Sequence, residues 1–261
     1  MSNIYVIGFP KSGNTWLVRL LARTLKAEVE KYTMNDSSPD LAADVNNEIK
    51  TSSKYKIYKV HFTLERFFKT YNIKKDDRII YIKRNILDVL VSSFFYYRYS
   101  GNEKYIFKRP PLEIIFNPLE IYKYMKGRNI FSRYIQEFCI KGNKNHGKWK
   151  NHINLWSNFL NQNKKIKSTI TSYENLLGDT KSELLKILEE LKLKNIEKNT
   201  IEEAVDEESL IKRRKNILST QKELTFGKNF NLKFLRKGRS GDYKRFLNSR
   251  QISYINSFVK E

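Results

Sequence analysis

Residues 3–16 read NIYVIGFPKSGNTW and form the most informative stretch of the chain. Its apolar first part, residues 3–9, has the composition of a buried strand and reaches the chain breakers Gly8 and Pro10 at its end. A helical pattern follows over residues 15–25, where apolar side chains recur at helical spacing. A strand, a tight turn and a helix in this order predict a turn whose backbone N–H groups bind a phosphate at the helix N-terminus.

The side chains of this turn suit an anion but depart from the common triphosphate loop. Lys11 brings a positive charge, and Ser12 and Thr15 bring hydroxyl donors. In the usual loop, G-x-x-x-x-G-K-[ST], a lysine follows the second glycine. Here Asn14 follows Gly13 and the lysine comes before it. The turn is therefore predicted to bind a phosphate group, but not as a standard ATP-binding loop.

Further strand and helix patterns alternate along the rest of the chain. Three more strands are predicted, at residues 55–61, 78–83 and 167–173. Helices are predicted at residues 88–97 and 149–161 and in the tail to Phe258. Two more are predicted to start at capping boxes: one at Thr180–Glu183, which runs to about Leu191, and one at Thr200–Glu203, which runs to about Asn216. This alternation predicts a P-loop-like, three-layer α/β/α fold with a central parallel sheet of four or five strands, in a single domain over residues 1–261.

Charge and composition restrict the function only broadly. The 50 Lys and Arg against 28 Asp and Glu give a formal charge of +22, which attracts nucleic acid, acidic lipid, nucleotides or sulfated and phosphorylated acceptors alike. A single cysteine rules out an intramolecular disulfide and favours a reducing compartment. With no signal-peptide pattern at its start and no apolar run of membrane-spanning length, the chain is expected to be cytoplasmic.

Three blocks of the sequence resemble, in the same order, motifs of the cytosolic sulfotransferases. Residues 10–16, PKSGNTW, resemble the family's PKSGTTW loop for 3′-phosphoadenosine-5′-phosphosulfate (PAPS), with Asn14 at the position of the commoner threonine. Residues 84–92, RNILDVLVS, resemble RNxxDxxVS, and residues 236–244, RKGRSGDYK, resemble RKGxxGDWK, with Tyr243 at the position of the tryptophan. Their order and their spread along the chain argue against coincidence.

This resemblance implies PAPS as the cosubstrate, its desulfated form PAP as the product, and no metal. It implies that Arg84 and Ser92 hold the 3′-phosphate, and a strand-end arginine and a serine two helical turns later can indeed face one anion. Trp16 is implied to stack on the adenine and Tyr173 to contact it. The third block is implied to close on the 3′-phosphate and adenosine through Arg236, Lys237 and Gly238.

The candidate general base is one of three histidines. His61 ends the second predicted strand in the triplet Lys59-Val-His61, and α/β folds bind ligands at the carboxyl ends of their strands. The resemblance implies the catalytic histidine at this place, and a neutral imidazole suits the removal of an acceptor proton. Lys11 is expected to stabilise the leaving phosphate, with Lys59 as a second stabiliser. His146 and His152 are interpreted as structural.

Two other functions compete with sulfuryl transfer. A P-loop ATP-dependent kinase would need a lysine after Gly13 and a strand-end carboxylate for Mg²⁺. A nucleic-acid-binding protein would rest on charge alone. The acceptor is expected to be a small molecule or a glycan, in a pocket built by residues 62–71 and 96–144, and no specific nucleic acid partner or membrane span is expected. The identity of the acceptor, hydroxyl or amine, and the oligomeric state stay open.

Overall fold

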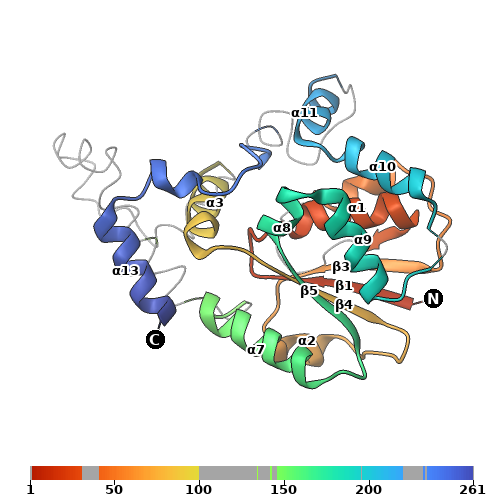
Figure 1. The fold of residues 1–261 in the computed structure, drawn as a ribbon, viewed down its shortest axis with the longest axis horizontal. Helices are drawn as coiled ribbons and strands as arrows, with labels where there is room; N and C mark the ends of the chain where they lie inside the picture. Colours follow the sequence, from red (N-terminus) through yellow and green to blue (C-terminus); the bar gives the residue numbers. More distant parts are fainter. Residues whose placement is uncertain are drawn as a thin grey trace.

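A parallel sheet stands at the centre of the protein (Figure 1). The computed structural model describes residues 2–30, 41–99, 134, 142, 146–194, 196–219, 232 and 234–260. These residues form a five-stranded sheet in the order β2-β3-β1-β4-β5, and every pairing is parallel. The strands are β1 (Ser2–Ile7), β2 (Glu28–Glu30), β3 (Tyr55–Val60), β4 (Arg78–Lys83) and β5 (Lys167–Ser172). The predicted parallel sheet is therefore confirmed.

The strand β4 shows why these apolar runs become strands. Ile79, Ile80, Tyr81 and Ile82 are all completely buried, because β4 lies between β1 and β5 and is covered on both faces. Alternate side chains enter different cores, with Ile80 and Ile82 on one side and Ile79 and Tyr81 on the other. A parallel strand that is buried on both faces has just this continuous apolar sequence.

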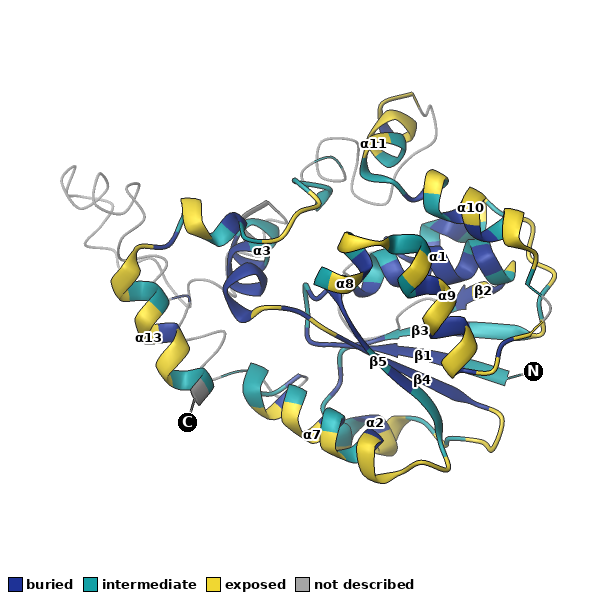
Figure 2. Ribbon diagram, viewed as in Figure 1, coloured by how far each residue is buried: buried dark blue, intermediate teal, exposed yellow. Residues whose placement is uncertain are grey.

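Helices cover both faces of the sheet, which confirms the three-layer α/β/α architecture (Figures 1 and 2). One face carries α1 (Asn14–Leu25), α8 (Tyr173–Gly178), α9 (Thr180–Glu190) and α10 (Lys198–Glu207). The other face carries α2 (Leu64–Thr70) and α7 (Trp149–Gln162). The first core includes Leu21 and Ile187, and the second is built around Phe67 and Trp156.

Further helices lie beyond the carboxyl edge of the sheet, where a ligand would bind. These are α3 (Ile86–Tyr99), the 3₁₀ turn η4 (Asp242–Arg245) and α13 (Ser249–Lys260). They share a separate apolar cluster that contains Leu90 and Ile255. Two remaining elements, η1 (Ala43–Asn47) and α11 (Leu210–Ser219), flank α1 and α10. None of the described helices has both the length and the apolar character that crossing a membrane requires.

The two predicted capping boxes are wrong. Asp179 caps α9, because its side chain accepts a hydrogen bond from Ser182 N at 2.9 Å, while the Thr180 hydroxyl donates to Leu176 O of the preceding helix. The helix predicted to start at Thr200 begins earlier, at Lys198. It is also not continuous, since α10 ends at Glu207 and α11 starts at Leu210. The residue at this break, Glu208, is buried in contacts with distant parts of the chain.

Candidate functional site

The sheet order brings four predicted site segments to one edge. The loop 8–13 follows β1, His61 follows β3, Arg84 follows β4, and Tyr173 follows β5. Since these strands are adjacent and parallel in the order β3-β1-β4-β5, the four segments stand in a row at their carboxyl ends. In the sheet, β1 lies between β3 and β4, and open α/β sheets bind ligands beyond the carboxyl ends of their strands where the strand order reverses.

The loop between β1 and α1 is tightly wound. Ser12 N donates to Phe9 O at 3.1 Å, and Gly13 caps the helix with a φ of 100°. A Cβ atom on Gly13 would lie 2.7 Å from Tyr173 Cδ2, so both the backbone angle and the neighbouring ring require glycine. The first N–H groups of α1 have no partner within the helix, and they stand at the carboxyl edge where an anion can accept them.

Lys11 is half-buried and lies among other cations. Its Nζ lies 4.0 Å from the ring centroids of both Tyr96 and Phe234, so two aromatic faces hold the ammonium. Burial, followed by the positive charges of Arg84, Lys59 and Arg236, lowers the pKa of Lys11 well below its ordinary value. Cations from separate segments thus converge on one place. An anionic ligand there would relieve their mutual repulsion.

Arg84 connects the loop after β1 to the C-terminal segment. Its Nη1 donates to Lys11 O at 3.1 Å and its Nη2 to Arg239 O at 3.4 Å, while the guanidinium lies 3.9 Å above the ring of Tyr173. The Nε of Arg84 and the Oγ of Ser12 are buried without a hydrogen-bond partner. Buried donors are nearly always satisfied in folded proteins, so these two atoms mark places where a ligand fits.

Asp88 of α3 holds the turn at residues 240–243, which follows Arg239. It accepts hydrogen bonds from Ser240 Oγ at 2.9 Å, Gly241 N at 2.7 Å and Tyr243 N at 3.3 Å. This carboxylate therefore fixes residues 236–244, the C-terminal block, against α3. Its role was not predicted, although the aspartate is one of the fixed letters of the motif RNxxDxxVS.

Asp242 plays a similar part within the C-terminal block and was also not predicted. It accepts hydrogen bonds from Arg236, from Lys237 Nζ at 3.0 Å and from Arg239 Nη2 at 3.0 Å. Burial raises the pKa of Asp242, but these three cationic donors outweigh it and hold the pKa well below its usual range. Gly238 gives the block its sharp turn with a φ of 55°. The block is thus a pre-shaped, cation-rich loop.

The remaining residues that were predicted to contact the nucleotide differ in how far they are buried. Trp16 is partly buried, donates from Nε1 to Glu208 O at 3.1 Å, and meets the ring of Tyr173 edge-on at 5.8 Å. Thr15 and Ser92 are partly buried, in the first turn of α1 and in α3 respectively. Asn14 is buried, and its Nδ2 donates to the Val6 carbonyl of β1 at 3.4 Å.

His61 has a defined tautomer. Its Nδ1 lies 2.7 Å from Gly8 O, and because a carbonyl can only accept, Nδ1 carries the hydrogen. The neutral ring then has its lone pair on Nε2. Burial, followed by the charge of Lys59, lowers the pKa of His61 to about 3. The neutral, proton-accepting form therefore dominates at physiological pH.

The helix α7 supports the backbone next to His61. Trp156 Nε1 donates to Phe62 O at 3.0 Å, and His152 Nδ1 is hydrogen-bonded to the Tyr81 hydroxyl at 2.8 Å. His146 and His152 both meet the ring of Phe9 edge-on. Both histidines are buried, consistent with their structural interpretation, but the fold gathers all three histidines of the chain near the loop after β1. Helical spacing alone could not show that.

Part of the predicted acceptor pocket is outside the described residues. Of the segment 96–144, the structure describes only residues 96–99, 134 and 142. In the ranges that are described, no group of three or more His, Cys, Asp or Glu side chains could hold a metal ion. The site as described can bind an anionic ligand along a row of cations and remove a proton at His61.

The sequence matches known proteins along nearly its whole length. A family model described as a sulfotransferase domain matches residues 2–261. The chain is 27% identical over 265 residues to 3-beta-hydroxysteroid sulfotransferase of Cavia porcellus, covering 98% of this chain and 81% of that protein. It is 25% identical over 288 residues to cytosolic sulfotransferase 7 of Arabidopsis thaliana, covering 100% of this chain and 78% of that protein.

Two solved structures share the fold. Mouse sulfotransferase SULT7A1 complexed with PAP aligns with a TM-score of 0.61 at 21% identity, covering 98% of this chain and 82% of that chain. Retinol dehydratase in complex with androsterone and the inactive cofactor PAP aligns with a TM-score of 0.59 at 15% identity, covering 99% of this chain and 79% of that chain.

Proposed function

The chain belongs to the sulfotransferase domain family, and we propose that it transfers the sulfuryl group of PAPS to a hydroxyl or amine of a small-molecule acceptor. The observation that carries the proposal is the position of Arg84, which joins the loop after β1 to the C-terminal block and has a buried, unpartnered Nε. A nucleotide with phosphates at both its 5′ and 3′ ends fits two anion-binding places on either side of this residue.

The described residues suit each part of PAPS. The loop 11–15, with its N–H groups and hydroxyls, would hold the 5′-phosphosulfate at the start of α1. Arg84, Ser92 and Arg236 would hold the 3′-phosphate, since arginine presents a planar fork of donors to a phosphate. The adenine would lie against Trp16 and Tyr173, whose rings are 5.8 Å apart, with Lys237 and Gly238 closing over the nucleotide.

His61 would act as the general base. The acceptor oxygen forms a bond to sulfur, the bond between sulfur and the 5′-phosphate oxygen breaks, and the acceptor proton moves to His61 Nε2. The Nδ1 hydrogen bond to Gly8 O orients the ring and stabilises the imidazolium that forms. Because PAPS is anionic, it opposes the charge of Lys59 and raises the pKa of His61, which makes the ring a stronger base in the complex than in the free enzyme.

Lys11 would stabilise the departing phosphate. Its ammonium lies between Tyr96 and Phe234, and burial among cations lowers its pKa. An anion beside it raises this pKa again and so favours the charged form, and negative charge grows on the leaving phosphate during transfer. Lys59, which precedes His61 by two residues, would be a second stabiliser.

The acceptor class is proposed from the surroundings of His61 and from a relative. The buried rings of Phe9, Phe62 and His146 give this side of the site an apolar, aromatic character, which suits an apolar molecule that carries a hydroxyl. The name of the relative from Cavia porcellus points to a hydroxysteroid for that protein. The kinase alternative lacks its lysine after Gly13, and neither it nor the nucleic-acid alternative is favoured by the family match.

A transfer assay with ³⁵S-labelled PAPS tests this function. The acceptor panel would contain a sterol, a phenol, a primary amine and an oligosaccharide, and γ-³²P-ATP with Mg²⁺ would be tested in parallel on the same panel. We expect label to pass from PAPS to a hydroxyl of an apolar acceptor and none to pass from ATP. Transfer from ATP without transfer from PAPS would establish the kinase instead.

A further inference from the structure

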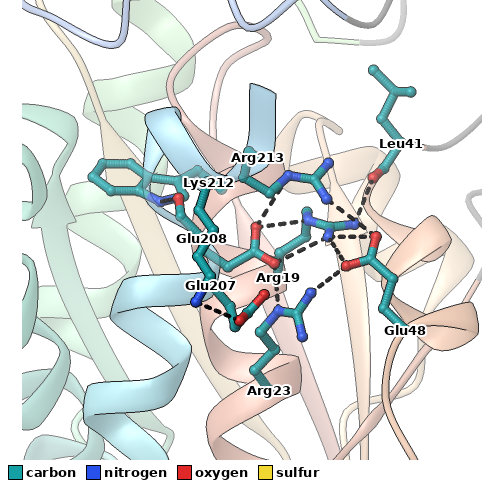
Figure 3. A network of polar contacts seen from close by, with 9 residues as sticks. Arg19, Arg23, Leu41, Glu48, Glu207, Glu208, Lys212 and Arg213 are labelled. Carbon is teal, nitrogen blue, oxygen red and sulfur yellow. Dashed lines mark hydrogen bonds and ion pairs between the residues drawn. The ribbon is translucent and has the colours of Figure 1, made fainter. Parts of the chain in front are cut away.

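A buried ionic cluster lies behind the nucleotide site (Figure 3). Arg19 and Arg23 of α1, Glu48 after η1, Glu208 between α10 and α11, and Arg213 of α11 form this Arg–Glu cluster. Arg19 Nε lies 2.8 Å from Glu208 Oε2, and Arg23 Nε lies 2.6 Å from Glu208 Oε1. Arg213 Nε approaches Glu208 Oε2 at 3.5 Å, so three arginines surround one carboxylate.

The centre of the cluster is dry. The side chains of Arg19 and Glu208 are only 2% and 1% exposed. Desolvating such charges costs so much that apolar side chains of the same volume would often stabilise a fold as well or better. Stability alone is therefore a poor account of the cluster. A buried ion pair does, however, tolerate few arrangements, which suits it to fixing the geometry of what is attached to it.

Glu208 is attached to the adenine side of the site. Its backbone carbonyl accepts the hydrogen bond from Trp16 Nε1 at 3.1 Å, across 192 residues of sequence. Trp16 is the residue against which the adenine is proposed to stack, and its ring meets that of Tyr173. The position of the Glu208 backbone therefore sets the position of the indole.

The next helix, α11, contacts the segment that is proposed to hold the 3′-phosphate. Arg214 of α11 donates from Nη1 to the carbonyls of Leu235 at 3.2 Å and Arg236 at 3.1 Å, at the start of the C-terminal block. Leu210, the first residue of α11, packs against Gly238, where an added Cβ would lie 3.0 Å from Leu210 Cδ2. The α10–α11 junction thus contacts both halves of the nucleotide site.

We infer that Glu208 is a positioning residue for nucleotide binding. Its buried carboxylate fixes the α10–α11 junction so that Trp16 and the C-terminal block face one nucleotide together. This inference rests on the proposed function. It implies that the cluster acts on affinity for the nucleotide and leaves the chemistry at His61, at the far end of the row of segments, unchanged. A role confined to stability would leave the affinity of the folded protein unchanged.

The test is calorimetry of PAP binding to the full-length wild type, Glu208→Gln and Glu203→Gln. Glutamine keeps the shape of the side chain and removes the charge, and Glu203 is an exposed glutamate of α10 that controls for the substitution itself. We expect Glu208→Gln to weaken PAP binding about tenfold and to raise KM for PAPS equally, with kcat and KM for the acceptor within about twofold of wild type. Glu203→Gln should bind like wild type.

A folded Glu208→Gln variant, judged by circular dichroism, that binds PAP as tightly as wild type overturns the inference. If Glu208→Gln does not fold, Arg213→Gln replaces it, since this change detaches α11 from the cluster and leaves Arg19 and Arg23 paired with both carboxylates. Wild-type affinity in Arg213→Gln would equally overturn the inference. Failure of the proposed function looks different, because the wild type itself would then not prefer PAP to AMP.

Discussion

At His61, the 2.7 Å hydrogen bond from Nδ1 to Gly8 O leaves Nε2 as the proton acceptor. Replacing the residue by alanine should lower the rate of sulfuryl transfer by about 10²–10⁴, the usual contribution of a general base. Affinity for PAP should stay near that of wild type, because a base acts mainly on the transition state. Labelled-PAPS kinetics and calorimetry measure the two effects separately. Near wild-type turnover in His61→Ala would remove this residue from the mechanism.

The three histidines also predict a dependence of stability on pH. Burial lowers the pKa of His61 and His152 to about 3 and of His146 to about 4, each below the ordinary value of 6.5. In the unfolded chain these rings take up protons as the pH falls below 6.5, while in the folded protein they stay neutral. Stability is therefore full above pH 6.5 and is lost as the pH falls, by up to about 1.4 kcal/mol per pH unit for each histidine.

Urea unfolding between pH 5 and 6.5 measures this effect, since most carboxylates do not titrate in that window. The slope of unfolding free energy against pH should be smaller in His61→Ala than in wild type, because one titrating ring is gone. An equal slope in the two proteins would mean that His61 takes up its proton as readily in the folded state as in the unfolded chain.

Among the elements, the connection between α3 and η4 carries a prediction of its own. Asp88→Ala removes the acceptor of hydrogen bonds from Ser240, Gly241 and Tyr243, so the C-terminal block is no longer held against α3. A hydrogen bond to a charged group contributes about 1.5–3 kcal/mol, so PAP binding should weaken by about tenfold to a hundredfold. Asp76→Ala, a change at an exposed turn, is the control. Equal PAP affinity in the two variants would rule out this role of Asp88.

The element boundaries were predictable where local sequence sets them. Four of the five described strands lie within two residues of their predicted ends, since a parallel strand that is covered by helices must be apolar along its length. The three-residue strand β2 is too short to leave a pattern. The break between α10 and α11 was missed because Glu208 owes its place to Arg19 and Arg23, which are remote in sequence.

Seen over the whole molecule, the candidate site was predictable because parallel strands end at one edge. His61, Arg84 and Tyr173 follow three such strands, and knowing the strands is enough to bring these residues together. What tertiary contacts alone create could not be predicted. The bond from Gly241 to Asp88 spans 153 residues, and the approach of His152 to Tyr81 depends on how α7 packs on the sheet.

The charge distribution of the whole site predicts that transfer does not depend on a divalent metal. Four cations lie close together in the site, because Lys59, Arg84 and Arg236 all lower the pKa of Lys11. Arg84 also donates a hydrogen bond directly to the Lys11 carbonyl. They can supply the positive charge that Mg²⁺ supplies in kinases. Transfer from labelled PAPS should therefore be unchanged in excess EDTA. Complete loss of activity, restored by added Mg²⁺, would return the kinase to consideration.

The central claim is that the protein recognises a 3′-phosphorylated adenosine nucleotide. The most direct measurement compares PAP with AMP by calorimetry in wild type, Arg84→Ala and Arg236→Ala. Since a charged hydrogen bond contributes about 1.5–3 kcal/mol, wild type should bind PAP far more tightly than AMP, and each variant should lose about tenfold to a hundredfold in PAP affinity. AMP affinity should change less. Equal affinity of the wild type for PAP and AMP would contradict the assignment of this site to PAPS.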